Sequence, residues 1–535
     1  MNTAVIFVFM TVTFLTSQIN CQEAILHISS ASKEQEFCIL YNHSWTPLPE
    51  RLDATVPYPV VNLTSTMLCD PSGVSPDVVK GNAVVVMRGD CTFSQKALVA
   101  QSLGATTLLI ASNITMIPPS ANGSEYSKVQ IPLALMRYRD FMEAQRVFGD
   151  EMQARLYAPL SSWIDGSIGV MLLISIVTVA LGGYWSGACE RERLNSGAEG
   201  ANRDNKAESG DIALYSPFKV FIFVCLMSGM LFLMYYFYNI LIYVMIAIFC
   251  IASATALFSC IDAVLEKLGC AHGNFTVFNA NFSLRSLILA SVCISISVVW
   301  AVYRNEDRWI WILQDLLGVA FCLYFIRTMS LSSFKICVIL LTLLLVYDVF
   351  FVFITPFFTK DGVSIMVQVA LGPGASEEKR RGNVVEVPAE PETPTETLPV
   401  VMRVPWFSAR AQNLCGMQFS ILGYGDIIVP GLLVAYCSRF DVWINSTKKI
   451  YFFSCCIAYL LGMITTFAVM LLSRMGQPAL LYLVPFTLIT SATVAACRGE
   501  IRQFWNGTSY EVLESSQEPL LPEARSDHPI EAEPC

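Results

Sequence analysis

Two stretches of the chain decide its fold: LLLVYDVFFVF at residues 343–353 and FSILGYGDIIVPGLL at residues 419–433. Each has the composition of a transmembrane helix, yet each contains one aspartate, Asp348 or Asp426. A charged side chain at the centre of a bilayer costs about 2.5–3.5 kcal/mol on insertion scales and usually marks a functional site. Two neighbouring carboxylates cannot both ionise, so we expect the pair to share one proton and to perform acid–base chemistry.

The composition is that of a polytopic membrane protein. Of its 535 residues, 54% are hydrophobic and 14% are charged, and the mean hydropathy is +0.53. Soluble domains average about 25% charged residues, so we expect an all-α polytopic membrane domain. No basic tract predicts nucleic-acid binding. Four histidines and the lack of an H-E-x-x-H motif argue against zinc proteolysis, and neither a metal nor another cofactor is expected.

The first part of the chain is expected to be exported. Residues 1–21 have the short apolar core of a signal peptide, although they lack a basic n-region. Residues 22–165 form a polar region with N-x-S/T sequons at Asn42, Asn62, Asn113 and Asn122, which predicts a glycosylated luminal domain. An oxidising lumen would permit a disulfide among the cysteines of this region, Cys38, Cys69 and Cys91, but the pairing stays open.

Within this region, the segment at residues 82–112 predicts a βαβ unit. An apolar strand from Ala83 to Met87 precedes a helix from about Thr92 to Leu103, and a second strand follows from Ala105 to Ile110. The segment resembles the protease-associated domain, a small α/β module found beside several peptidases. A generic α/β ectodomain is the alternative.

Hydropathy predicts a membrane domain at residues 166–497. We expect nine spans, at residues 166–187, 217–238, 240–262, 284–303, 309–329, 334–358, 417–437, 451–473 and 477–497. The Pro-, Glu- and Thr-rich stretch at 359–416 is expected to be a flexible luminal loop. Nine spans after a luminal N-terminus place the tail at 498–535 in the cytosol, where we expect it to be disordered.

Three short motifs carry the chemistry. Tyr347 and Asp348 form a Y-D pair in the sixth predicted span, and Gly423-Tyr424-Gly425-Asp426 forms a G-x-G-D motif in the seventh. Glycines beside an intramembrane aspartate permit close backbone approach and local unwinding. Pro478-Ala479-Leu480, at the start of the ninth span, combines a helix breaker with a small residue.

In this order and spacing, the motifs resemble those of the intramembrane aspartyl proteases that include presenilin and signal peptide peptidase. With a glycosylated protease-associated domain in front, the chain is similar to the second subfamily of signal-peptide-peptidase-like proteins. The resemblance implies a presenilin-like nine-helix fold, in which Asp348 and Asp426 are catalytic and Pro478, Ala479 and Leu480 shape the active site. Tyr424 departs from the family pattern, which more often has Leu or another apolar residue there.

The expected reaction is hydrolysis without a covalent intermediate. One ionised Asp deprotonates a water and the protonated Asp polarises the scissile carbonyl, while the assignment of acid and base stays open. With a luminal N-terminus, the resemblance implies substrates of type II orientation, expected to be stubs left after ectodomain shedding, whose cleavage releases cytosolic fragments. Membrane lipid surrounds the spans, and a homo-oligomer is left open.

Two further hypotheses remain beside proteolysis. An ion-coupled transporter or channel would use the two intramembrane aspartates as ligands, and a catalytically silent receptor would keep only the fold. Asp315, in the fifth span and without neighbouring glycine, is expected to be a structural partner near the luminal surface.

The tail offers a trafficking clue. Tyr510 to Leu513 fits a Y-x-x-Φ signal for sorting adaptors, which predicts a late endosomal or lysosomal location, with the plasma membrane or Golgi as alternatives.

Overall fold

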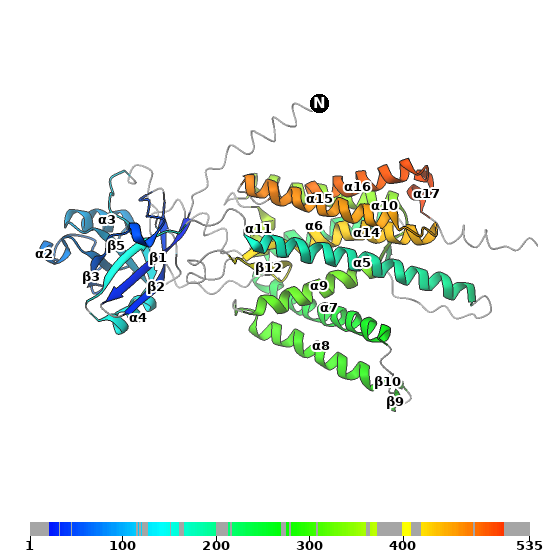
Figure 1. Ribbon diagram of the computed structural model, residues 1–535, viewed down its shortest axis with the longest axis horizontal. Helices are drawn as coiled ribbons and strands as arrows, with labels where there is room; N and C mark the ends of the chain where they lie inside the picture. The colour runs from blue at the N-terminus through cyan, green and yellow to red at the C-terminus, as the bar shows by residue number, and fades with distance from the viewer. Residues whose placement is uncertain are drawn as a thin grey trace, which may run out of the picture.

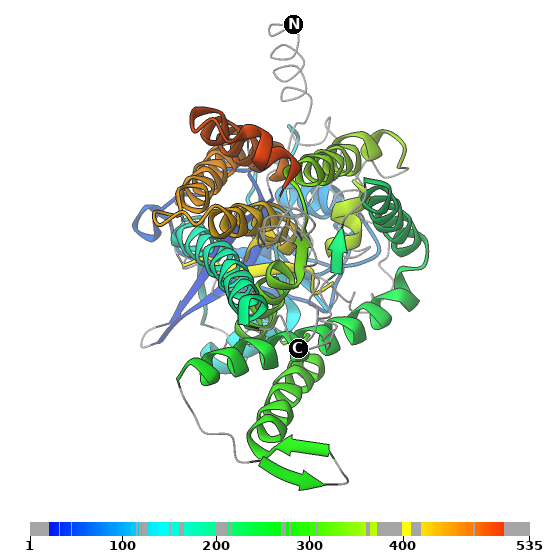
Figure 2. The same cartoon turned by 90° about the vertical axis from the view of Figure 1, so that its right-hand side faces the viewer.

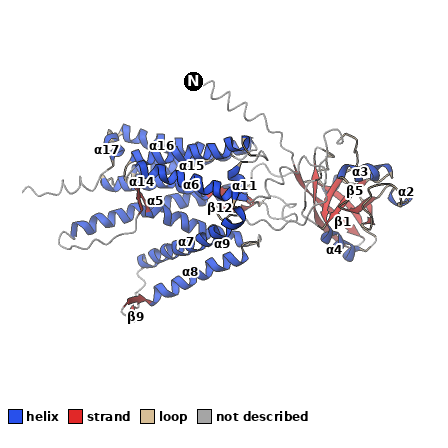
Figure 3. Ribbon diagram, turned by 180° about the vertical axis from the view of Figure 1, so that it is seen from behind, coloured by secondary structure: helices blue, strands red, loops and turns tan. Residues whose placement is uncertain are grey.

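The structure is a computed structural model with two parts, a sheet-containing domain at one end and a long helical bundle (Figures 1 and 3). The residues that it describes are 21–30, 33–43, 45–113, 116, 119, 127–149, 151–159, 165–199, 212–214, 217–268, 274–277, 280–306, 309–359, 364–371, 398–407, 419–473 and 477–507. The predicted signal peptide therefore lies outside the described residues, except for Cys21, the first residue of β1.

Seven strands build the first domain. They are β1 (Cys21–Ser30), β2 (Lys33–Asn42), β3 (Tyr58–Leu63), β4 (Ala83–Met87), β5 (Thr107–Ser112), β6 (Leu133–Arg137) and β7 (Gln153–Tyr157). Strands β3, β4, β5 and β6 pair in parallel in that order, while β1, β2 and β7 join them through antiparallel pairs. Parallel strands need crossover connections, and the helix at Phe93–Ser102 supplies the one between β4 and β5.

The two faces of the parallel sheet bury alternate residues of each strand. On β4, Val84 and Val86 pack with α3 (Phe93–Ser102), whereas Val85 lies on the face packed by α4 (Tyr138–Phe148). This alternation follows from the two-residue period of a strand. Short turns at η1 (Leu52–Ala54) and α2 (Pro76–Val79) complete the domain.

The predicted βαβ unit is confirmed. The strand at Ala83–Met87 has the expected bounds, and Thr92 caps the following helix by accepting a hydrogen bond from the Gln95 N–H. The second strand begins at Thr107, two residues later than expected. A disulfide joins Cys69 to Cys91, which answers part of the pairing question that the sequence left open.

Eight helices in the described part of the chain are long and apolar enough to cross a membrane. They belong to α5 (Gly166–Glu199), α6 (Pro217–Tyr236), α7 (Tyr238–Lys267), α8 (Leu284–Tyr303), α9 (Ile310–Thr328), α10 (Phe334–Val349), α15 (Ile450–Ser473) and α16 (Leu480–Cys497). Their positions agree with eight of the nine predicted spans.

The remaining predicted span corresponds to α14 (Tyr424–Trp443), which is less apolar because it carries Asp426, Arg439 and Asp441. It packs against α5, α9, α10, α15 and α16, and Figure 2 shows it in gold inside the bundle. Its predicted start at residue 417 is wrong, because residues 419–423 form strand β13. The helix starts only at Tyr424.

The stretch predicted as a flexible loop at 359–416 contains regular structure. A short helix, α11 (Ile365–Leu371), follows α10, and β12 (Val401–Pro405) pairs antiparallel with β13 (Phe419–Gly423). Both α11 and β12 lie at the end of the bundle nearer the sheet domain (Figure 1). Two further pairs, β8 (Ile212–Leu214) with β11 (Met329–Leu331) and β9 (Asn274–Val277) with β10 (Ala280–Ser283), connect other helices.

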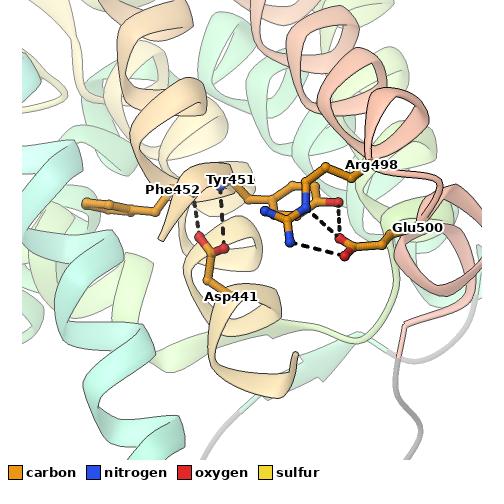
Figure 4. Close-up of polar contacts among 5 residues, drawn as sticks. All are labelled: Asp441, Tyr451, Phe452, Arg498 and Glu500. Carbon is orange, nitrogen blue, oxygen red and sulfur yellow. Dashed lines mark hydrogen bonds and ion pairs between the residues drawn. The ribbon is translucent and has the colours of Figure 1, made fainter. Parts of the chain in front are cut away.

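At the other end of the bundle, a polar cluster ties α14, α15 and the chain after α16 together (Figure 4). The Asp441 carboxylate caps α15 by accepting hydrogen bonds from the N–H groups of Tyr451 at 3.4 Å and Phe452 at 2.8 Å. The Tyr451 hydroxyl donates to Glu500 at 2.7 Å, and Arg498 pairs with the same carboxylate. Burial raises the pKa of Glu500, but these hydrogen bonds outweigh burial and lower its pKa overall.

This cluster positions α17 (Ile501–Asn506), whose Phe504 is fully buried among the aromatic rings of Phe334, Tyr436, Phe440 and Tyr451. The Tyr436 hydroxyl donates a hydrogen bond to the Phe504 carbonyl at 2.7 Å. The tail predicted as disordered from residue 498 is therefore ordered through Gly507. Because the folded protein lowers the pKa of Glu500, the ionised Glu500 carboxylate stabilises the fold fully at a pH above its ordinary pKa. This stabilisation is lost as the pH falls through the lowered pKa.

The buried Phe504 predicts a stability effect. Phe504→Ala should cost about 3–5 kcal/mol, because it empties a fully buried aromatic site. Phe453→Ala is the matched control, since Phe453 is 57% exposed. Thermal unfolding of the detergent-solubilised protein measures both variants, and equal midpoints for the two would refute the docking of α17.

Candidate active site

Asp348 lies at the end of α10, where the regular helix stops. It is 3% exposed, and the chain after it forms a π-helical turn, η2 (Phe350–Ile354), followed by a 3-10 turn, η3 (Thr355–Phe357). Turns of the π type often occur at functional sites, because they re-aim side chains and free backbone groups. The ring of Tyr347 packs 4.7 Å from that of Phe351, which holds the start of this turn against the helix.

The Pro-Ala-Leu motif starts a helix beside Asp348. Ala479 is the N-cap of α16 and Leu480 is its first residue, while Pro478 lies just outside. The first N–H groups of a helix lack partners within the helix, so this start leaves a free donor. The backbone N–H of Leu480 is a hydrogen-bond partner of the Asp348 carboxylate. The motif therefore supplies a donor for one of the two acids.

The G-x-G-D motif forms the start of α14 rather than its interior. Gly423 is the N-cap, and Asp426 lies in the first turn, where the helix dipole favours a negative charge. An added Cβ on Gly423 would lie 3.3 Å from Asp426 Oδ2, so glycine leaves that carboxylate its room. The motif was expected inside the seventh span, whereas the structure places it at the start of the helix, directly after β13.

The carboxyl groups of Asp348 and Asp426 lie close enough for their charges to interact. Asp348 is buried, while Asp426 is half-buried beside Gly425, which is exposed and has no heavy atom within 4 Å of an added Cβ. Two carboxyl groups that interact can share one proton, which is the arrangement that acid–base hydrolysis requires. In the described residues, no group of three or more His, Cys, Asp or Glu could hold a metal ion.

Three features of the site were missed in the sequence. Tyr459 of α15 is fully buried and donates a hydrogen bond to the Asp426 carbonyl at 3.5 Å. The β12–β13 hairpin leads directly into the G-x-G-D motif, and the π-helical turn follows Asp348. The apolar and β-branched residues of VMRVP at 401–405 were a weak signal for the strand, whereas nothing local marks Tyr459 or the π-helical turn.

Asp315 does not join the acid pair. It is 7% exposed on α9, and its Oδ1 accepts a hydrogen bond from the Arg403 N–H of β12 at 2.9 Å. Its Oδ2 has no hydrogen-bond partner among the described residues. The expectation of a structural partner fits these contacts.

The predicted glycosylation sites differ in accessibility. Asn62 and Asn113 are exposed, whereas Asn42 is 2% exposed and its amide donates to the Pro119 carbonyl at 3.2 Å. A glycan on Asn42 is incompatible with this conformation. Asn122 and the sorting residues Tyr510 and Leu513 lie outside the described residues.

Comparison with known proteins agrees with this geometry. The family model of signal peptide peptidase matches residues 207–511, and the PA domain model matches residues 56–143. The chain is 46% identical to signal peptide peptidase-like 2A of Mus musculus, over 92% of this chain and 91% of that protein. It is also 46% identical to signal peptide peptidase-like 2A of Homo sapiens, over 94% and 93% of the two chains.

A further relative is signal peptide peptidase-like 2B of Rattus norvegicus, which is 42% identical over 93% of this chain and 84% of its own length. These matches support proteolysis, and nothing in them supports the transporter hypothesis. The chain therefore belongs to the signal peptide peptidase family of intramembrane aspartic proteases, with a PA domain before its membrane bundle.

Proposed function

We propose that Asp348 and Asp426 are the catalytic pair and that the protein cleaves transmembrane segments of type II membrane proteins, releasing cytosolic fragments. One observation carries the proposal. The ends of three helices, α10, α14 and α16, bring the two carboxyl groups into electrostatic contact beside the open space at Gly425. Motif residues that are far apart in the sequence thus contribute to a single site.

Each residue of the pair has a distinct environment. Asp348 is buried and bonded to the Leu480 N–H, which fixes its orientation. Asp426 is half-buried at the opening, where a water and the scissile peptide can approach. In the proposed step, the pair shares one proton: the ionised carboxylate takes a proton from water, and the protonated carboxyl donates a hydrogen bond to the substrate carbonyl. The hydroxide adds to the carbonyl carbon, and the amine leaves with a proton from the pair.

Orientation sets the substrate class. Sequons at Asn62 and Asn113, on exposed positions of the PA domain, support a luminal N-terminus. Basic residues near the other bundle end, including Lys448, Lys449 and Arg498, support a cytosolic side there. With the N-terminus of the enzyme in the lumen, we propose that the substrate helix enters the bundle with its own N-terminus in the cytosol, which is the type II orientation.

The cellular location follows from the tail. Tyr510 comes three residues after Gly507, the end of the described chain, and α17 is docked on the bundle just before it. A Y-x-x-Φ sequence that follows the last helix within a few residues is the pattern that sorting adaptors recognise, and it supports a late endosomal or lysosomal destination.

The catalytic assignment predicts loss of cleavage in isosteric variants. Asp348→Asn and Asp426→Asn keep the side-chain volume but remove the acid–base pair, so each should lower cleavage of a tagged type II stub by about 100-fold or more. Asp262→Asn, on α7 and paired with Arg285, is the matched control and should cleave normally. The measurement is release of the cytosolic fragment in cells. Normal release by either site variant would overturn the assignment.

The two glycines of the motif should act differently. Gly423→Ala crowds Asp426 Oδ2, so we expect a lower kcat. Gly425→Ala meets no protein atom but narrows the open space, so we expect a higher KM with kcat largely preserved. Steady-state kinetics on the purified enzyme separate the two effects. The same kinetic change in both variants would contradict the placement of the opening at Gly425.

A further inference from the structure

Two adjacent residues of α9 hold the backbone of β12. The Gln314 side-chain amide donates to the Val401 carbonyl at 2.8 Å, and Asp315 Oδ1 accepts from the Arg403 N–H at 2.9 Å. Both side chains are buried, with exposed fractions of 5% and 7%. The two bonds are made two residues apart on one edge of the strand, so they fix its register as well as its position.

The same stretch of α9 also holds Tyr424, the variable residue of the G-x-G-D motif. Its hydroxyl donates to the Gln314 carbonyl at 3.1 Å, and the side chain is 5% exposed. Gly318 lies one helical turn after Gln314, where a side chain would cover that carbonyl. An added Cβ on Gly318 would overlap the hydroxyl end of the Tyr424 ring.

These contacts converge on the entry into α14. Strand β12 pairs with β13, the Tyr424 N–H donates to the Val400 carbonyl at 3.1 Å, and Asp426 follows two residues later. One helix, α9, therefore holds both the hairpin and the Tyr424 ring through hydrogen bonds, although it contributes no residue to the acid pair.

We propose that Gln314, Asp315 and Gly318 of α9 are positioning residues for peptide-bond hydrolysis: they hold the β12–β13 hairpin and the Tyr424 side chain, and so set the position of Asp426 relative to Asp348. The inference rests on the proposed function of Asp348 and Asp426 as the catalytic pair. The inference also explains Tyr424, because its ring packs on the surface of α9 where Gly318 has no side chain.

A small displacement of Asp426 is sufficient to affect the reaction. A misplacement of about 1 Å at a reacting group can cost roughly 100-fold in rate. Because the contacts act through the position of Asp426, which takes part in the chemical step, we expect the loss to fall on kcat more than on KM.

The role of Asp315 as an acceptor can be tested by conservative replacement. Asp315→Asn keeps an oxygen for the Arg403 N–H and should retain kcat within about 3-fold, whereas Asp315→Ala should lower kcat by about 10-fold or more. Leu316→Ala is the matched control, because Leu316 is the next residue of α9 and is 46% exposed. Equal losses in Asp315→Asn and Asp315→Ala would overturn the acceptor role.

The decisive experiment pairs Gly318 with Tyr424. In Gly318→Ala, the new methyl overlaps the ring end, so kcat should fall by about 10- to 100-fold with KM nearly unchanged. A leucine at 424 does not reach the atoms that this methyl would meet. Tyr424→Leu alone should therefore lose only a few-fold in kcat, and Gly318→Ala with Tyr424→Leu should recover most of the loss seen in Gly318→Ala.

Kinetics on a type II reporter are measured well below the unfolding temperature of each variant, together with the affinity of a transition-state isostere that binds the acid pair without substrate. Weaker isostere binding by Gly318→Ala, restored in the double variant, supports positioning. A folded Gly318→Ala protein with wild-type kcat, or no recovery in the double variant, overturns the proposal. If the wild type neither cleaves nor binds the isostere, the catalytic assignment itself fails, and this inference with it.

Discussion

The placement of two carboxyl groups within an apolar helical bundle, with Asp348 buried and Asp426 half-buried, is the constraint on which the rest of the structure depends. Neither acid can be left without polar partners at that depth, because unsatisfied charge in a low-dielectric environment is costly. The fold meets this requirement with helix ends. Asp348 lies where α10 ends and beside the free N–H groups of α16, and Asp426 lies in the first turn of α14. The breaks in helical structure therefore occur where the chemistry needs polar backbone.

Helix ends at membrane depth must themselves be held in place, and the surrounding elements do so. The β12–β13 hairpin fixes the start of α14, and α9 fixes the hairpin through Gln314 and Asp315. At the far end of the bundle, Asp441 caps α15 (Figure 4). The buried ring of Phe504 packs there against neighbouring aromatic side chains. The acid pair is thus placed by a rigid frame whose polar contacts are concentrated at the two ends of the bundle.

The sequence predicts the composition of this site better than its local geometry. Two aspartates in apolar stretches, two glycines and one Pro-Ala-Leu motif were sufficient to identify the residues that meet, and hydropathy located the spans. Hydropathy could not place the start of α14, because Phe419 to Leu422 are as apolar as the helix that follows. The partner strand of β13 is β12, which comes before it in the chain and is separated from it by residues 406–418. The pairing of these two strands therefore depends on tertiary contacts. Asn42 shows the same limit, since a sequon carries no information on burial.

The most direct test of the central claim is a cryo-electron microscopy map of the protein bound to a transition-state isostere. The account predicts that the central hydroxyl of the isostere lies between the carboxyl groups of Asp348 and Asp426, beside Gly425 and close to the start of α16. Density for the isostere at another place in the bundle, or two aspartates too far apart to contact the same hydroxyl, would contradict it.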